Sequence, residues 1–98
     1  MHIKIHKAYR TIVALADSEI IGKNFEEGIM QIEVNPNFFR GEQKSEKEVI
    51  EILKEMYNED AIFNIVGERS VFCALKAGII NKNGIIKIQG IPVALWLL

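Results

Sequence analysis

The sequence predicts a single α+β domain in which a small, largely antiparallel sheet is packed on one side by two main helices. Three observations predict this fold class. The chain has 98 residues, the length of one domain. Its first residues alternate apolar and polar side chains, as in a half-buried strand. Two later segments, residues 45–58 and 68–78, repeat apolar residues at helical spacing.

Residues 2–7 and 11–16 are expected to form an antiparallel hairpin. In the first strand, Ile3 and Ile5 would face one side, and the two histidines and Lys4 the other. The second strand is more continuously apolar and β-branched, so we expect it to be the more central of the two.

The next segment is predicted to contain a short turn, a loop and one strand. Asp17 or Ser18 can cap the turn, and Gly22 can close it. Residues 23–28 are expected to be a loop, and residues 29–34 a third strand. The side chains expected to point inward from this strand are Met30, Ile32 and Val34.

Asn35, Pro36 and Asn37 are predicted to stop the third strand, because proline cannot continue a strand ladder and asparagine favours turns. An irregular segment with Phe38 and Phe39 would then close one edge of the core.

The first main helix is predicted from a capping box, in which Ser45 caps the helix and Glu48 bonds back to it. The side chains expected to be buried are Val49, Ile50, Leu53, Met56 and Tyr57.

The second main helix is predicted to begin at Gly67, with Glu68 at the positive end of the helix dipole. Lys76 suits its last turn, and Gly78 can close it in a left-handed conformation. Its buried stripe would contain Val71, Ala74 and Leu75. Residues 81–84 are then expected to turn the chain. Strands are expected over residues 85–89 and 93–97, with a turn at residues 90–92 between them.

Polar residues gather at the start of this second helix. Asn64, Gly67, Glu68 and Arg69, together with Lys23, can form a small partner-binding patch. The alternative is a solvated first turn, in which Asn64 bonds to nearby backbone.

Composition limits the classes of function. The net charge is −1 with 26% charged residues, so the whole molecule does not attract nucleic acid or anionic membrane. Cys73 is the only cysteine, which excludes an intramolecular disulfide. The N-terminus does not resemble a signal peptide, and the apolar tail, residues 91–98, is too short to span a bilayer. We expect a cytoplasmic protein without membrane contact. The abundance of Ile, Lys and Glu favours a hot-living source.

Motifs for metal, phosphate or nucleophilic chemistry are not complete, so we expect no cofactor. His2 and His6 would lie about 13 Å apart on a strand, too far for one ion. Gly22-Lys23 lacks the first glycine and the Ser or Thr of a phosphate-binding loop. Cys73 has no histidine near it in the expected fold, so it would be an inert buried thiol.

The N-terminal hairpin is basic, since no acidic residue precedes Asp17. If it contacts RNA, Lys4, Lys7 and Arg10 would bind phosphates and Tyr9 would stack on a base. The alternative is an ordinary solvated surface.

The sequence resembles an archaeal family of small proteins known as domain of unknown function four-two-four. The resemblance covers nearly the whole chain, and its most specific part is the string from Asn64 to Arg69 before the apolar helix. Residues 15–28 and Gly90-Ile91-Pro92 also carry it, although Val93-Ala94-Leu95 stand where the family often has His-Ala-Gln. The resemblance implies a compact α+β fold and an archaeal cytoplasm, with no established activity.

We therefore expect a non-catalytic binding or accessory module whose partner is an RNA–protein assembly such as the translation machinery. One alternative is a small enzyme with Glu68 as acid–base and Arg69 or Lys23 as an anion clamp. Another is a homodimer joined through the last strand, whose end, Trp96-Leu97-Leu98, is unusually apolar.

Overall fold

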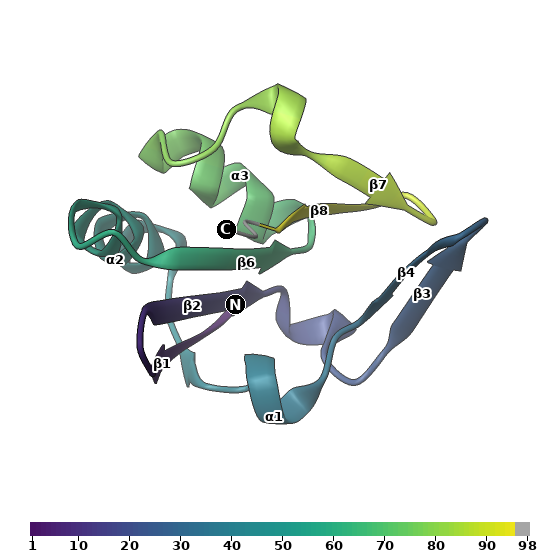
Figure 1. Ribbon diagram of the computed structural model, residues 1–98, viewed down its shortest axis with the longest axis horizontal. Coiled ribbons are helices and arrows are strands. Elements are labelled where there is room, and N and C mark those ends of the chain that lie inside the picture. Colours follow the sequence, from purple (N-terminus) through teal and green to yellow (C-terminus); the bar gives the residue numbers. More distant parts are fainter. Residues whose placement is uncertain (96–98) are drawn as a thin grey trace.

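Within the described residues, 1–95, the centre of the computed structural model is a six-stranded mixed sheet in the order β5-β1-β2-β6-β8-β7 (Figure 1). The strands are β1 (His2–Lys7), β2 (Thr11–Ala16), β3 (Asn24–Glu27), β4 (Met30–Glu33), β5 (Glu42–Gln43), β6 (Ile62–Val66), β7 (Ile86–Ile88) and β8 (Ile91–Leu95). The helices are α1 (Pro36–Phe39), α2 (Glu46–Asn58) and α3 (Glu68–Ala77), with 3₁₀ turns η1 (Ser18–Ile20) and η2 (Lys82–Gly84).

The pairing of the strands confirms the predicted α+β class and the largely antiparallel sheet. β1 and β2 form the expected hairpin, in which Ile5 lies opposite Val13. β6 pairs antiparallel with β8, and β8 with β7. The exception is the central pair, β2 and β6, which is parallel and places Val13 beside Phe63. No strand was expected at residues 62–66, yet β6 lies in the middle of the sheet.

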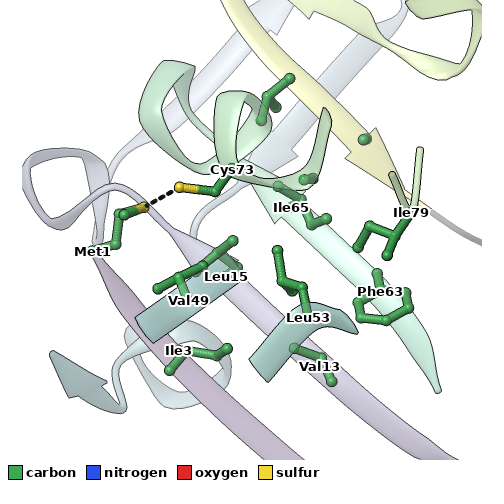
Figure 2. Packing of buried hydrophobic residues seen from close by; sticks show 13 residues of the cluster. Met1, Ile3, Val13, Leu15, Val49, Leu53, Phe63, Ile65, Cys73 and Ile79 are labelled. Atoms are coloured by element: carbon green, nitrogen blue, oxygen red, sulfur yellow. Dashed lines mark hydrogen bonds between the residues drawn. The ribbon is translucent and has the colours of Figure 1, made fainter. Parts of the chain in front are cut away.

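One face of the sheet, here called the helix face, is covered by α2 and α3. The side chains that fill the space between them form the larger hydrophobic core (Figure 2). Val13 and Leu15 from β2 and Phe63 and Ile65 from β6 point into it, and all four are at most 2% exposed. The helices contribute Val49, Leu53, Val71, Cys73 and Ala74.

The opposite face, here called the second face, is covered by smaller elements. Figure 1 shows α1 and the β3–β4 hairpin on the side away from α2 and α3. A second cluster fills this layer: Ala14, Ala16, Ile20, Val34, Phe39, Val66, Ile88 and Val93. The sheet is therefore apolar on both faces at its centre, which explains the continuously apolar β2.

Both main helices were predicted correctly. The capping box of α2 is present, because Glu48 N donates to Ser45 Oγ and Ser45 N donates to Glu48 Oε1. α3 begins after Gly67 and ends at Gly78, whose φ is 75°. Tyr57, expected to be buried, is 51% exposed, because the last turn of α2 extends beyond the core.

Several local predictions were wrong. Residues 24–27 form strand β3 rather than a loop, and Met30 of β4 is exposed. Residues 36–39 form the short helix α1, whose cap is Asn35, since the Asn35 side chain accepts a hydrogen bond from Asn37 N.

Two further corrections concern the sheet. The short strand β5 was not expected. Pro92 belongs to strand β8 rather than to a turn, and lies opposite Lys87 of β7. The tail proposed for a homodimer, Trp96-Leu97-Leu98, lies outside the described residues.

Candidate site at the start of α3

The polar segment singled out in the sequence lies where β6 ends and α3 begins. Gly67 occupies this junction with φ 112° and ψ 156°, and it has no side chain that could cap the helix. The first backbone N–H groups of any helix lack partners within the helix. Those of α3 must therefore find an acceptor elsewhere in the chain.

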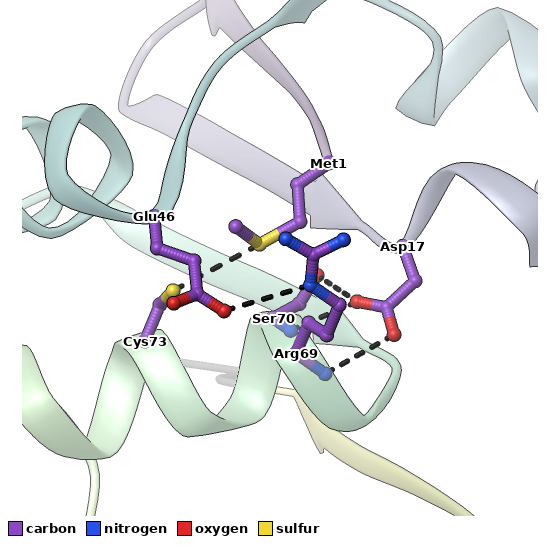
Figure 3. Close-up of polar contacts among 6 residues, drawn as sticks. All are labelled: Met1, Asp17, Glu46, Arg69, Ser70 and Cys73. Carbon is purple, nitrogen blue, oxygen red and sulfur yellow. Dashed lines mark hydrogen bonds and ion pairs between the residues drawn. The ribbon is translucent and has the colours of Figure 1, made fainter.

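Asp17 supplies that acceptor from the end of β2. Its Oδ2 accepts from Arg69 N at 3.1 Å, and its Oδ1 accepts from Ser70 N at 2.8 Å and from Ser70 Oγ at 2.7 Å (Figure 3). Asp17 is 4% exposed and Ser70 is fully buried. A carboxylate at a helix N-terminus is stabilised by both the amides and the helix dipole.

The parallel pairing of β2 and β6 explains why Asp17 reaches α3. The two strands end side by side, with Ala16 opposite Val66. The next residue, Asp17, donates its own N–H to Val66 O at 3.2 Å. A Cβ atom at position 67 would collide with the Asp17 carboxylate, so only glycine fits there. The position of the Asp17 carboxylate therefore depends on a glycine at position 67.

This arrangement corrects the expectation that Asp17 caps a local turn. Asp17 does precede η1, but its side chain makes no hydrogen bond to that turn and caps α3 instead. Ser70 was not singled out in the sequence at all. The signal that could have found the pair is the glycine at the cap position of α3, since a helix without a local cap needs a distant one.

Glu68 and Arg69 point outward from the first turn of α3. Both residues are exposed, and Arg69 Nε lies 3.5 Å from Glu46 Oε2 at the start of α2. The two side chains of this ion pair are 59% and 44% exposed, so the pair contributes less than about 1 kcal/mol to stability. Figure 3 shows this ion pair together with the buried Asp17–Ser70 contact.

The other two members of the predicted patch lie elsewhere. Asn64 is two residues before Val66 on β6, so its side chain points to the second face of the sheet, away from α3. Lys23 lies between η1 and β3, where its N–H donates to Ile20 O and its C=O accepts from Val34 N. The structure brings Gly67, Glu68 and Arg69 together with Asp17 and Ser70, but not with these two residues.

Cys73 lies in the core on the helix face, where its Sγ is 3.8 Å from Met1 Sδ (Figures 2 and 3). Burial raises the pKa of the Cys73 thiol, and the nearby Glu46 carboxylate raises it further. His2 and His6 alternate with the buried Ile3 along β1, so both imidazoles lie on the second face. The sheet therefore separates the thiol from both histidines.

The basic side chains of the N-terminal hairpin divide into two groups. His2 Nδ1, Lys4 Nζ and His6 Nε2 donate to main-chain carbonyls of Gly41, Asn37 and Phe38, at 3.0, 2.9 and 2.9 Å. Arg10 Nη2 donates to Asp60 O at 2.7 Å. These four side chains hold neighbouring segments against the hairpin. Lys7 and Tyr9 are exposed, and Tyr9 is 104% exposed at the tip.

Two further findings concern residues 1–95. No group of three His, Cys, Asp or Glu side chains is arranged to hold a metal ion in this part of the chain. Within the same range, every helix is too short or too polar to cross a bilayer.

Comparison with known proteins gives a family and a fold. The model of a family described as "Protein of unknown function (DUF424)" matches residues 6–97. The crystal structure of an uncharacterized conserved protein from Methanopyrus kandleri is similar, with a TM-score of 0.83 and 18% sequence identity. The similarity covers 95% of this chain and 86% of that chain. At this identity the likeness concerns the fold alone. No curated protein matches the sequence.

Proposed function

We propose, from the premise that this chain belongs to the DUF424 family, that it is a small non-catalytic binding module. Its contact surface would be the first turn of α3, where Glu68 and Arg69 stand exposed on a rigid base. The partner would be a macromolecule, because exposed charged side chains at a helix end suit a surface contact rather than a small ligand.

The observation that carries this proposal is that the N-terminus of α3 is already capped by the side chain of Asp17. A helix N-terminus with free amides is a ready anion site. Here the amides of Arg69 and Ser70 already bond to the Asp17 carboxylate. A phosphate or carboxylate ligand would have to displace a buried side chain. The alternative enzyme, with Glu68 as acid–base and Arg69 or Lys23 as anion clamp, would have to hold its anion through side chains, and Lys23 lies apart from Glu68 and Arg69.

The finer part of the proposal concerns the partner and the compartment. We expect the partner to be an RNA–protein assembly such as the translation machinery, in the cytoplasm of an archaeon. The family match and the likeness to a protein from an archaeon support this source.

A pull-down from native cell extract tests the contact surface. The bait would be the wild-type chain, an Arg69→Glu variant, and a Lys54→Glu control with the same charge change on the exposed face of α2. Wild type and the control should retain the same partners, with and without nuclease, and Arg69→Glu should lose them. Equal retention by all three baits would contradict the proposed surface, provided circular dichroism shows that all three are folded.

The tip of the β1–β2 hairpin supports a second candidate, a contact with single-stranded RNA. Tyr9 is fully exposed, and the exposed Lys7 lies two residues before it. Stacking of one base on an aromatic ring contributes about 1–3 kcal/mol. We expect Tyr9→Ala to weaken binding of a fluorescent single-stranded RNA about tenfold, and Lys7→Ala to lower the salt slope by about 0.7. Unchanged anisotropy titrations for both variants would exclude this contact.

A further inference from the structure

The outer edge of β1 is only partly covered. β5 pairs with His2 and Ile3 alone, and Lys44 N donates to Met1 O at 3.1 Å just before this pairing. Backbone groups that point to one side of a strand recur at every second residue. The backbone N–H and C=O groups of Met1 and Ile3 point toward the β5 segment. Those of Ile5 and Lys7 therefore point outward, away from β2. In the described part of the chain, no strand pairs with this half of the edge.

A groove adjoins the open half of the edge on the helix face. It has a volume of about 260 Å³ and lies between β1, the start of β5 and the side of α2. Its apolar lining includes Ile5, which is 39% exposed, and Ile52 of α2. The opposite end is polar, where Lys44 Nζ lies 3.3 Å from Glu42 Oε2. An apolar side chain that enters beside Ile5 would therefore contact Ile52.

We propose that this edge binds an extended segment of a partner protein, which adds a strand to the sheet along Ile5, His6 and Lys7. The segment would lie beside Ile5 and Lys7, beyond Gly41, which already packs against Ile3 and Lys4. It would take its hydrogen bonds from the outward N–H and C=O groups of Ile5 and Lys7. One β-branched aliphatic side chain of the segment would fill the groove between Ile5 and Ile52. This surface is separate from the start of α3.

The charge of β1 favours a foreign strand over a second copy of this chain. β1 carries Lys4, His6 and Lys7 and no acidic residue. The Lys4 and His6 side chains already bond to main-chain carbonyls, so Lys7 is the cation of β1 that a new strand would meet. A second copy that placed its Lys7 opposite this Lys7 would bring like charges together, which is unfavourable. An acidic residue of the partner opposite Lys7 would be favoured instead. The His6 ring stacks on Phe38 at 4.6 Å, which holds the edge in an extended form for an incoming strand.

Selection from a phage-displayed library of random ten-residue peptides tests the proposal. The bait is the full chain, and each selected peptide is then titrated into ¹⁵N-labelled protein. We expect selected peptides to alternate β-branched aliphatic and polar residues and to include an acidic one. Binding should slow hydrogen exchange at the amides of Ile5 and Lys7. It should also leave the amides of Glu68 and Arg69 unchanged, which separates this result from the proposed function.

A matched pair of variants supplies the control. Ile5→Lys places a lysine on β1, next to the short outer strand β5, and Ile86→Lys places one on the outer strand β7. The two residues are 39% and 47% exposed. Ile5→Lys should weaken peptide binding about tenfold, because it removes the apolar wall of the groove. Ile86→Lys should leave binding unchanged.

Three outcomes would overturn the proposal. The first is that no peptide is enriched above the background of the Ile5→Lys bait. The second is that bound peptides protect the β7 edge or the start of α3 instead of Ile5 and Lys7. The third is a dimer in analytical ultracentrifugation that Ile5→Lys dissociates, since this would make a second copy the occupant.

Discussion

At the scale of single residues, one buried carboxylate joins two segments that are far apart in the sequence. Asp17 and Ser70 are separated by 53 positions, yet Asp17 Oδ1 accepts two hydrogen bonds from Ser70. Hydrogen bonds to a charged group contribute about 1.5–3 kcal/mol each to stability, and an unpaired buried donor carries a penalty of similar size. The contact therefore fixes the position of α3 against the sheet.

Replacing Asp17 by Ala should lower the free energy of unfolding by about 3 kcal/mol, because three donors at the start of α3 lose their acceptor. Ser18→Ala, at the adjacent exposed residue, should change it by less than about 0.5 kcal/mol. Urea denaturation followed by circular dichroism measures both values. A similar small loss for both variants would show that the Asp17 contact does not stabilise the fold.

Two glycines of α3 allow a matched test of the crowding around Asp17. Gly67 and Gly78 both have positive φ, but a Cβ at position 67 meets the Asp17 carboxylate whereas one at position 78 meets open space. Gly78→Ala should cost about 1 kcal/mol through backbone strain alone. Gly67→Ala should lower the free energy of unfolding by at least about 2 kcal/mol more than Gly78→Ala, because the Asp17 side chain that caps α3 must move as well. Equal losses in denaturation would contradict the close packing.

The Asp17 contact also shows where prediction from sequence stops at this scale. The exposed Glu68 and Arg69 were correctly expected at the first turn of the helix. Asp17 was expected to cap its own turn, because local capping is what a sequence pattern describes. Its true partner depends on the parallel pairing of β2 with β6, and no pattern around residue 17 records that pairing.

At the scale of elements, α2 is held at its start by a reciprocal pair of hydrogen bonds. The bond from Ser45 N to the Glu48 carboxylate, and the further bond from Ser45 Oγ, hold the pKa of Glu48 below its ordinary value of 4.5. A carboxylate whose pKa is lowered by folding stabilises the folded state above its unfolded pKa. That contribution is lost as the pH falls through the lower, folded-state pKa.

Glu48→Gln should therefore remove part of the pH dependence of stability. Wild type should lose more stability than Glu48→Gln between pH 7 and pH 3, because the glutamine cannot be protonated in this range. Parallel urea denaturations at several pH values give the difference between the two proteins. The hypothesis is wrong if the two curves stay a constant distance apart across this range.

Elements with a strong local signal were predicted, and those that depend on neighbours were not. α2 and α3 carry caps and apolar stripes, and the β1–β2 hairpin shows strict alternation. β5 has two residues, too few for any pattern. β6 was absorbed into the apolar stretch before α3, since a short buried strand and a buried helix look alike in sequence. α1 was missed although Asn35 and Pro36 together form a typical helix start.

At the scale of the whole molecule, stability depends on the core between the sheet and the two main helices. Leu53 is fully buried there, whereas Tyr57 lies one turn further along α2 and is 51% exposed. Leu53→Ala should lower the free energy of unfolding by about 2–5 kcal/mol. Tyr57→Ala should lower it by less than about 1 kcal/mol. Thermal unfolding of both variants checks this ranking. Equal melting temperatures for the two variants would contradict it.

The parallel pairing at the centre of the sheet affects how the chain can be made. A ribosome synthesises the chain from its N-terminus, so β1 and β2 emerge long before β6, which is the neighbour of β2 in the sheet. Until Gly67 and Ser70 have left the exit tunnel, the inner edge of β2 has no partner strand and Asp17 has no helix to cap. Contacts between such distant segments form late and slowly. In the nascent chain, the inner edge of β2 therefore stays unpaired until the last third of the protein has been synthesised.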